Sequence, residues 1–511
     1  MAMAPADPTT TPSDGFSAHR LWERGLDRYP DTAARYRYLA VAVFVTIVLY
    51  YELYVAGGVA PLMLAHFKMS FLYYVNVLVF ANLVGAFGSL AAGIADRWGR
   101  ANLVTYGLLG TGVLTILTPL APNKATFAVV TILTGLVEGM CLVATPALVR
   151  DFSPQIGRAS AMGFWTLGPV IGSLVVSFVA NRTLPRFDDS WSSQYYIVGV
   201  VGLVAFAVAL FGLRELRPGL RDQVMVSVAD RALVESRAEA AEREADLRHP
   251  WRQMLRLDVL APALGVSVFL LIYYTAVAFF TIYLTSNFAL TTARANGVNS
   301  WYWAMNAVAL VVVGVVSDRL RVRKPFIVAG TLLAVVMTFL FMTRTTHPHT
   351  SASTLIWIIS LLAVGLGVAY TPWMAAFTET IERRNPALTA TGLAIWGWIL
   401  RIVVCVSYFV LPYVVGAVDT LTRAPEVLAA AKKVPAGTAP PPTLLHELGE
   451  LKKAAADAPH QWQAWWWICI VAELLFLVLM LPLAGRWSPR TARADADAHA
   501  REVERLTGAQ G

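Results

Sequence analysis

Twelve apolar stretches constrain the fold of this chain more than any other feature of its sequence. Each has about 20 residues, the length that an α-helix needs to cross a hydrocarbon core roughly 30 Å thick. Only 14% of the 511 residues are charged, whereas a soluble protein has about 25%. Backbone groups in lipid must be satisfied within their own segment, so the stretches are predicted to be helices. They lie at residues 39–64, 71–95, 102–121, 125–149, 159–180, 194–213, 259–285, 298–317, 325–343, 354–377, 389–415 and 463–484.

The distribution of basic residues predicts how these spans are oriented. Twelve spans place both termini on one side, and the tails and loops of that side carry 29 of the 41 Lys and Arg residues. The opposite loops carry 11, and Arg401 lies inside a span. Because cytoplasmic loops are enriched in Lys and Arg, we expect a multi-pass protein of the cell membrane with both termini in the cytoplasm. The net charge of +8 then reflects topology, and no nucleic-acid partner is expected.

An internal repeat divides the chain into two halves. Four short motifs recur in the same order at offsets of 222 to 229 residues, and such recurrence is typical of a duplicated unit. The pairs are Tyr50-Tyr51 with Tyr273-Tyr274, Asp96-Arg97 with Asp318-Arg319, Pro146 with Pro372, and Gly163 with Gly392. The sequence therefore predicts an all-α membrane protein whose twelve transmembrane helices form two pseudo-symmetric six-helix bundles.

The same division predicts the domain boundaries. In chain order, the predicted regions are a cytoplasmic tail at 1–38, a first bundle at 39–213, a charged cytoplasmic segment at 214–258, a second bundle at 259–484 and a second tail at 485–511. The second bundle contains a long outer loop, 418–461, in which "PAGTAPPP" separates two helix-like stretches. This loop is interpreted as a tolerated insertion, and the alternatives are a lid or a docking surface.

Two short loops carry a recognisable motif. "GIADRWGRAN", residues 93–102, follows the second span, and "GVVSDRLRVRKP", residues 314–325, follows the eighth. An Asp at a helix end and Arg residues in a tight turn can pair with each other and with helix termini, and Gly99 allows the first turn to stay short.

The loops resemble the motif Gly-x-Leu-Ala-Asp-Arg-x-Gly-Arg-Lys of the major facilitator superfamily. Ala92 and Ala101 depart from it in the first copy, and Arg321 replaces the glycine in the second. The resemblance implies two bundles around a central cavity lined mainly by the first, fourth, seventh and tenth helices, with alternating access by rocking of the halves. It also implies that the loops act as cytoplasmic gates, and the alternative is a charge cluster that only sets topology. The matching gate residues are Asp96, Arg97, Gly99 and Arg100 in the first copy and Asp318 and Arg319 in the second.

Four ionisable residues lie near the middle of predicted spans: Glu52, Glu138, Arg401 and Glu473. Each costs about 2.5 to 3.5 kcal/mol at a helix centre, so pairing, a wet cavity or protonation is required. Our hypothesis is that Glu52 or Glu138 is the proton site, because burial disfavours a charged carboxylate and lets the acid load and release a proton. The alternative is a permanent Glu–Arg ion pair between the bundles. For Glu473 we expect a structural role, because the superfamily places the twelfth helix outside the cavity.

The same depth offers groups for binding a substrate. Arg401 stays charged and its fork of N–H donors suits carboxylates, so it is a candidate for holding an anion. Aromatic rings and hydroxyls add further contacts, and these candidates are Tyr50, Tyr51, Tyr54, Tyr273, Tyr274 and Trp398.

These features predict a secondary active transporter for a small organic solute, acting as a monomer in the bilayer and coupled to protons, with uptake of an organic anion by symport. One alternative is proton-driven export of a drug or metabolite, which the segment "GPVIGS" at 168–173 slightly favours. The other is a non-transporting sensor or assembly factor on the same fold. Enzymatic activity is not expected, because all eight histidines lie outside the spans and no metal-ligand spacing, phosphate loop or nucleophile elbow is visible. We expect no cofactor and no metal.

Overall fold

The computed structural model describes residues 22–90, 98–152, 158–217, 254–384, 389–434 and 440–490, together with the single residues 220 and 501. Asp96 and Arg97 of the first predicted gate lie outside the described residues, as do most of the two tails and of the central segment.

In the first half, the described residues form two short paired strands and six long helices. Its elements are β1 (Gly25–Leu26), α1 (Thr32–Phe67), α2 (Phe71–Leu90), α4 (Arg100–Leu117), the 3-10 turn η2 (Thr118–Leu120), α5 (Lys124–Asp151), α6 (Arg158–Thr183), η3 (Leu184–Arg186), α7 (Trp191–Gly212) and β2 (Glu215–Leu216). The second half contains α11 (Leu257–Phe269), α12 (Leu271–Phe288), α13 (Thr292–Leu320), α14 (Lys324–Arg344), α15 (Ala352–Arg384), α16 (Thr389–Val414), α17 (Ala417–Thr422), α18 (Ala424–Lys432) and α19 (Pro442–Leu479).

Twelve helical segments are long and apolar enough to cross a membrane, and each predicted span overlaps one of them. The helices extend beyond the apolar stretches because hydropathy marks only the part that needs lipid. α1, for example, has 36 residues, or about 54 Å at 1.5 Å per residue. The seventh span is divided into α11 and α12 at Leu270. Ser267 donates a hydrogen bond to the Ala263 carbonyl just before this point, a contact that often bends helices.

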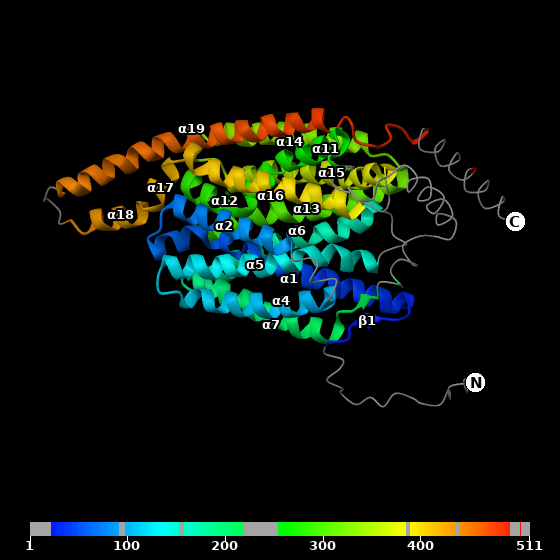
Figure 1. The fold of residues 1–511 in the computed structure, drawn as a ribbon. Helices are drawn as coiled ribbons and strands as arrows, with labels where there is room; N and C mark the ends of the chain where they lie inside the picture. The colour runs from blue at the N-terminus through cyan, green and yellow to red at the C-terminus, as the bar shows by residue number, and fades with distance from the viewer. Residues whose placement is uncertain are drawn as a thin grey trace, which may run out of the picture.

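The two halves repeat one packing pattern. In the first half α1 packs against α6 and α7, α2 against α5, and α4 against α5 and α7. In the second half α11 packs against α16 and α19, α13 against α15, and α14 against α15 and α19. The halves meet through α6 with α13, α2 with α16, and α1 with α12. Figure 1 shows the first half lying below the second. The predicted fold, two pseudo-symmetric six-helix bundles, is confirmed.

The two ends of the molecule differ. At one end lie β1, β2 and the end of α19, and we call this the tail end (Figure 1). At the other end α17, α18 and the first part of α19 form a protruding helical hairpin, residues 417–461, and we call this the hairpin end. The hairpin falls in the predicted outer loop, most of whose described residues are therefore helical. The two helix-like stretches predicted within this loop are confirmed, because α18 precedes the Pro-rich segment and the start of α19 follows it.

Candidate functional site

Six tyrosines from both halves gather where α1 meets the second half, and we call them the tyrosine cluster. The members are Tyr50 and Tyr54 on α1, Tyr273 and Tyr274 on α12, Tyr370 on α15 and Tyr408 on α16. Each lies within electrostatic range of other members. The ring centroids of Tyr50 and Tyr54 are 5.4 Å apart, and the Tyr408 hydroxyl donates to the Tyr274 carbonyl at 3.2 Å. The cluster thus presents aromatic faces and hydroxyls at the junction of the halves.

Arg401 borders this cluster from α16. Its guanidinium lies within electrostatic range of Tyr50 and Tyr274. Nη1 is 3.7 Å from the place where a Cβ at Gly85 of α2 would stand, so this glycine leaves room for the arginine. Arg401 is partly buried and forms no ion pair with an acid in the described part of the chain. The alternative of a permanent Glu–Arg pair between the bundles is therefore not seen among the described residues.

The other two aromatic candidates lie in different surroundings. Trp398 is partly buried and lies about one turn before Arg401 on the same helix. Tyr51 is 3% exposed and packs in the apolar core, next to Tyr50 in sequence but on another face of α1.

Glu52 is buried inside the first half. Its Oε2 accepts a hydrogen bond from the Thr111 hydroxyl of α4 at 2.6 Å. Its Oε1 faces Gly112 of α4 and Gly202 of α7, and any side chain at Gly202 would collide with it. The carboxyl group therefore lies between α1, α4 and α7.

Glu138 is the acid without a partner. It is 1% exposed, and neither carboxyl oxygen has a hydrogen-bond partner among the described residues. The side chain lies within electrostatic range of Glu52 and of Tyr50, which in turn interacts with Arg401. Tyr50 thus lies within electrostatic range of both the buried acid of the first half and the arginine of the second. An unpaired buried carboxylate costs several kcal/mol, on the order of 3 to 5, and a bound proton removes that cost.

Glu473 of α19 repeats the arrangement of Glu52 in the other half. Its Oε1 accepts from the Thr338 hydroxyl of α14 at 2.9 Å, and the acid is fully buried. Thr338 follows Thr111 by 227 residues, within the range of the internal repeat. Each half therefore contains one buried Glu–Thr bond that joins two of its helices.

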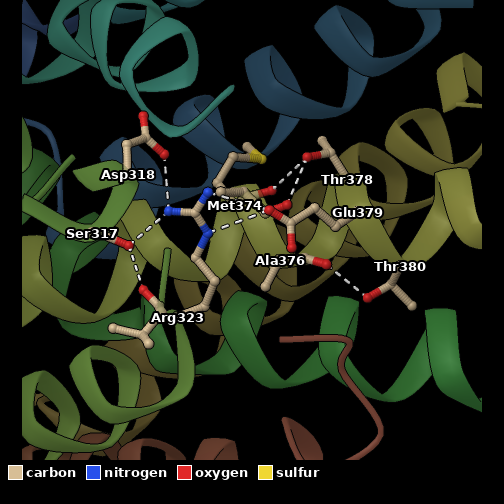
Figure 2. Close-up of polar contacts among 10 residues, drawn as sticks. Ser317, Asp318, Arg323, Met374, Ala376, Thr378, Glu379 and Thr380 are labelled. Carbon is tan, nitrogen blue, oxygen red and sulfur yellow. Dashed lines mark hydrogen bonds and ion pairs between the residues drawn. The ribbon is translucent and has the colours of Figure 1, made fainter. Parts of the chain in front are cut away.

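The second predicted gate forms a charge cluster at the tail end of the second half (Figure 2). The Arg323 guanidinium pairs with Asp318 at 2.9 Å and with Glu379 of α15 at 3.2 Å, and Nη1 also donates to Ser317. Asp318 thus pairs with Arg323, while Arg319 lies in the last turn of α13. Arg321, which replaces the expected glycine, ends α13 with φ 55°, a left-handed conformation that costs a side chain about 1 to 2 kcal/mol.

The described part of the first gate is held by its own half. Gly99 has φ 92°, which explains the glycine at this turn. The Arg100 amide donates to Glu215 at 3.0 Å. Asn102, in the first turn of α4, donates to the carbonyls of Trp98 and Trp22, each at 2.8 Å.

Arg24 also supports this turn. Its Nε donates to Asn102 at 2.7 Å, and its Nη1 donates to the carbonyls of Ala209 and Leu210 near the end of α7 at 2.8 and 2.9 Å. Arg24 is 1% exposed, and burial lowers its pKa. The residue just after it begins β1, which pairs in parallel with β2. Residues 22–26 are therefore part of the tail end of the first half.

A family model described as Major Facilitator Superfamily matches residues 42–407. The chain belongs to the Major Facilitator Superfamily. Among curated relatives, the gallate transporter of Pseudomonas putida is 25% identical over 316 residues, which cover 58% of this chain and 70% of the relative.

Solved structures of the superfamily share the fold. A bacterial homologue of the human lysosomal transporter Spinster, in an inward-facing and unoccupied conformation, has a TM-score of 0.64 at 14% identity and covers 89% of this chain and 98% of that chain. The proton:xylose symporter XylE has a TM-score of 0.60 at 14% identity and covers 88% and 96%. This superfamily member is thus a multi-pass integral membrane protein of a transporter family.

Several functional candidates of this superfamily member were not identified from the sequence. Tyr370 lies in the repeated "YTP" motif, and Glu379 lies in "FTETIERR" near the end of α15; both signals were visible. Arg24 offered no such signal because its partners, the Asn102 side chain and carbonyls at the end of α7, lie far away in the chain. Among the described residues, no group of three or more His, Cys, Asp or Glu side chains could hold a metal ion.

Proposed function

We propose that this superfamily member takes up a small organic anion together with protons by alternating access, with the tail end in the cytoplasm. The observation that carries the proposal is that Tyr50 lies within electrostatic range of both Glu138 and Arg401. A buried acid of one half, which has no hydrogen-bond partner among the described residues, and an arginine of the other half thus lie near the same tyrosine where the halves meet.

The substrate site in this proposal is Arg401 with the tyrosine cluster. A guanidinium binds carboxylates with two parallel hydrogen bonds, and the tyrosines supply ring faces and hydroxyl donors. Such a site suits a small organic acid that contains a ring. The relative from Pseudomonas putida is named for gallate, so gallate is the first substrate to test.

The proton site in this proposal is Glu138 in preference to Glu52. Glu52 already has the Thr111 hydroxyl as a partner, and the Glu473–Thr338 bond repeats that arrangement on a helix that the superfamily places outside the cavity. Glu138 has no such partner and lies near the tyrosine cluster. The similarity to XylE, which is named a proton symporter, agrees with proton coupling.

Uptake into proteoliposomes tests the proposal. We expect gallate, or another ring-containing acid from a panel, to accumulate when an imposed gradient makes the outside acidic. Collapsing the gradient with a protonophore stops the accumulation. Arg401→Ala is expected to weaken substrate affinity by about tenfold or more, because a charged hydrogen bond is worth about 1.5 to 3 kcal/mol. Unchanged affinity in Arg401→Ala contradicts this site. No uptake and no counterflow across the panel would favour the non-transporting alternative.

Proton-driven export is the second candidate. It is favoured by the packing of the "GPVIGS" segment of α6 against the site. A Cβ at Gly172 would stand 2.7 Å from the Cβ of Tyr50, and one at Gly168 would stand 2.5 Å from a methyl group of Thr46. The segment thus brings α6 directly onto a residue of the tyrosine cluster. To test export, liposomes are loaded with substrate and the outside is made acidic relative to the inside. Loss of the substrate under this gradient, together with no gradient-driven accumulation, supports export.

A further inference from the structure

A contact at the hairpin end joins the two halves. The backbone amide of Phe71, the first residue of α2 in the first half, donates to the Asp419 carboxylate of α17 in the second half at 2.6 Å. Two residues later, the Tyr73 amide donates to the Ser70 hydroxyl of the same half. The first amides of a helix have no partner within the helix, and a negative charge is favourable there. Asp419 therefore caps a helix that belongs to the other half.

Other contacts at the hairpin end hold the halves together in this arrangement. The Asn296 side chain of α13 donates to the Gly58 carbonyl of α1 at 2.7 Å. The backbone of Gly57 lies directly against the Val277 carbonyl of α12, so that a side chain could not be accommodated. The hairpin end is therefore closed.

The residue that provides the cap is fixed to its own half. The Ala417 amide at the start of α17 donates to the Gln461 side chain of α19 at 2.8 Å, and Val418 is fully buried. Because α17 is held by α19, a rocking motion that separates the halves at this end moves Asp419 with the second half and Phe71 with the first. The hydrogen bond breaks in that motion.

We propose that Asp419 is a state-dependent latch that stabilises the closed hairpin end by capping α2 across the boundary of the halves. It is a positioning residue for alternating access, and it sets the ratio of closed to open molecules at this end. The inference rests on the alternating access of the proposed function and is independent of protons and of substrate identity. Loss of a side-chain acceptor at a helix N-terminus typically costs about 1 kcal/mol, which corresponds to about a fivefold change in that ratio.

The test measures the distance between the halves directly. Spin labels are placed at two exposed sites of the hairpin end, Ala125→Cys in the first half and His349→Cys in the second, after replacing the three native cysteines. Distance distributions are recorded by pulsed electron resonance in liposomes, without substrate or pH gradient. The series is repeated in an Asn296→Ala background, which removes the hydrogen bond to the Gly58 carbonyl. We expect this change to raise the open population, so that short and long distances are both recorded.

We expect Asp419→Ala to raise the ratio of long to short distances by about fivefold relative to its parent. Asp419→Asn should restore most of the short population, because Asn is also a good N-cap. The matched control is Asp31→Ala: Asp31 accepts from the Ala34 amide at 2.7 Å and caps α1 within a single half, so its loss should not change the distribution.

The latch is overturned if Asp419→Ala gives the same distribution as its parent in both backgrounds, or if Asp31→Ala has an equal effect. Neither result depends on transport, so the uptake proposal can fail while the latch stands. Conversely, if Asp419→Ala shows normal proton-driven uptake and unchanged distances, the proposed latch is contradicted and the proposed uptake function stands.

Discussion

The two halves of this superfamily member share a packing pattern and differ in the ionisable and aromatic residues that they carry. Each half contains one buried Glu–Thr bond, Glu52 with Thr111 and Glu473 with Thr338. Among the described residues, the first half adds an acid whose two carboxyl oxygens have no hydrogen-bond partner, Glu138. The second half instead contributes Arg401 and four of the six tyrosines of the cluster. The repeated bond therefore joins two helices within each half, while the proposed proton and substrate sites rest on the residues that differ between the halves.

The helix that carries the acid of the Glu–Thr bond also differs between the halves. In the first half the acid, Glu52, lies on α1, and the absence of a side chain at Gly202 of α7 leaves room for its carboxyl group. The internal repeat places Thr275 of α12 at the position of Glu52. The Thr275 hydroxyl accepts a hydrogen bond from the Trp465 indole of α19 at 3.1 Å. The acid of this half, Glu473, lies on α19. The same three-helix junction can thus be stabilised by either arrangement.

The largest effect is expected from filling the space that Glu52 requires. Gly202→Ala places a methyl group where the carboxyl oxygen lies and separates Glu52 from Thr111, which we expect to destabilise the first half by about 3 kcal/mol. The melting temperature in detergent measures the effect. Gly397→Ala is the control, because a Cβ there meets nothing within 4 Å. Equal melting temperatures for the two variants would show that the junction around Glu52 is not tightly packed.

An intermediate effect is expected from the threonines, and it sharpens the comparison of the halves. Thr111→Val and Thr338→Val each leave a buried acid without its donor, so each should cost about 2 kcal/mol and lower the melting temperature to a similar extent. Gradient-driven uptake should persist in both. If Thr111→Val abolished the response to pH while Thr338→Val kept it, Glu52 would be the proton site and the two bonds would not be equivalent.

The smallest effect is expected at the exposed ion pair between the halves. Lys68 and Glu426 are 3.9 Å apart, with 78% and 51% of their side chains exposed. Water and salt screen such a pair, so Lys68→Ala should lower the free energy of unfolding by no more than about 0.5 kcal/mol. The melting temperature in detergent should therefore change only slightly. A larger loss, or one that disappears in high salt, would mean that surface charge contributes to holding the hairpin against the first half.

The sequence predicted the spans and the two halves because hydropathy and repeat spacing are properties of single segments. It also placed Glu52 and Glu138 at mid-depth. It did not predict which neighbours these acids face, because that depends on residues far away in the chain, such as Gly202 beside Glu52. The Asp419 cap was likewise not predictable, because its partner is a backbone amide 348 residues away.

The central claim is that Glu138 binds the proton while Arg401 binds the substrate. Gradient-driven uptake and substrate counterflow, measured side by side in proteoliposomes, test it most directly. Glu138→Gln should lose gradient-driven accumulation and retain counterflow, Arg401→Ala should lose both, and Glu473→Gln should retain both. Accumulation driven by the pH gradient at the wild-type level in Glu138→Gln would contradict the account.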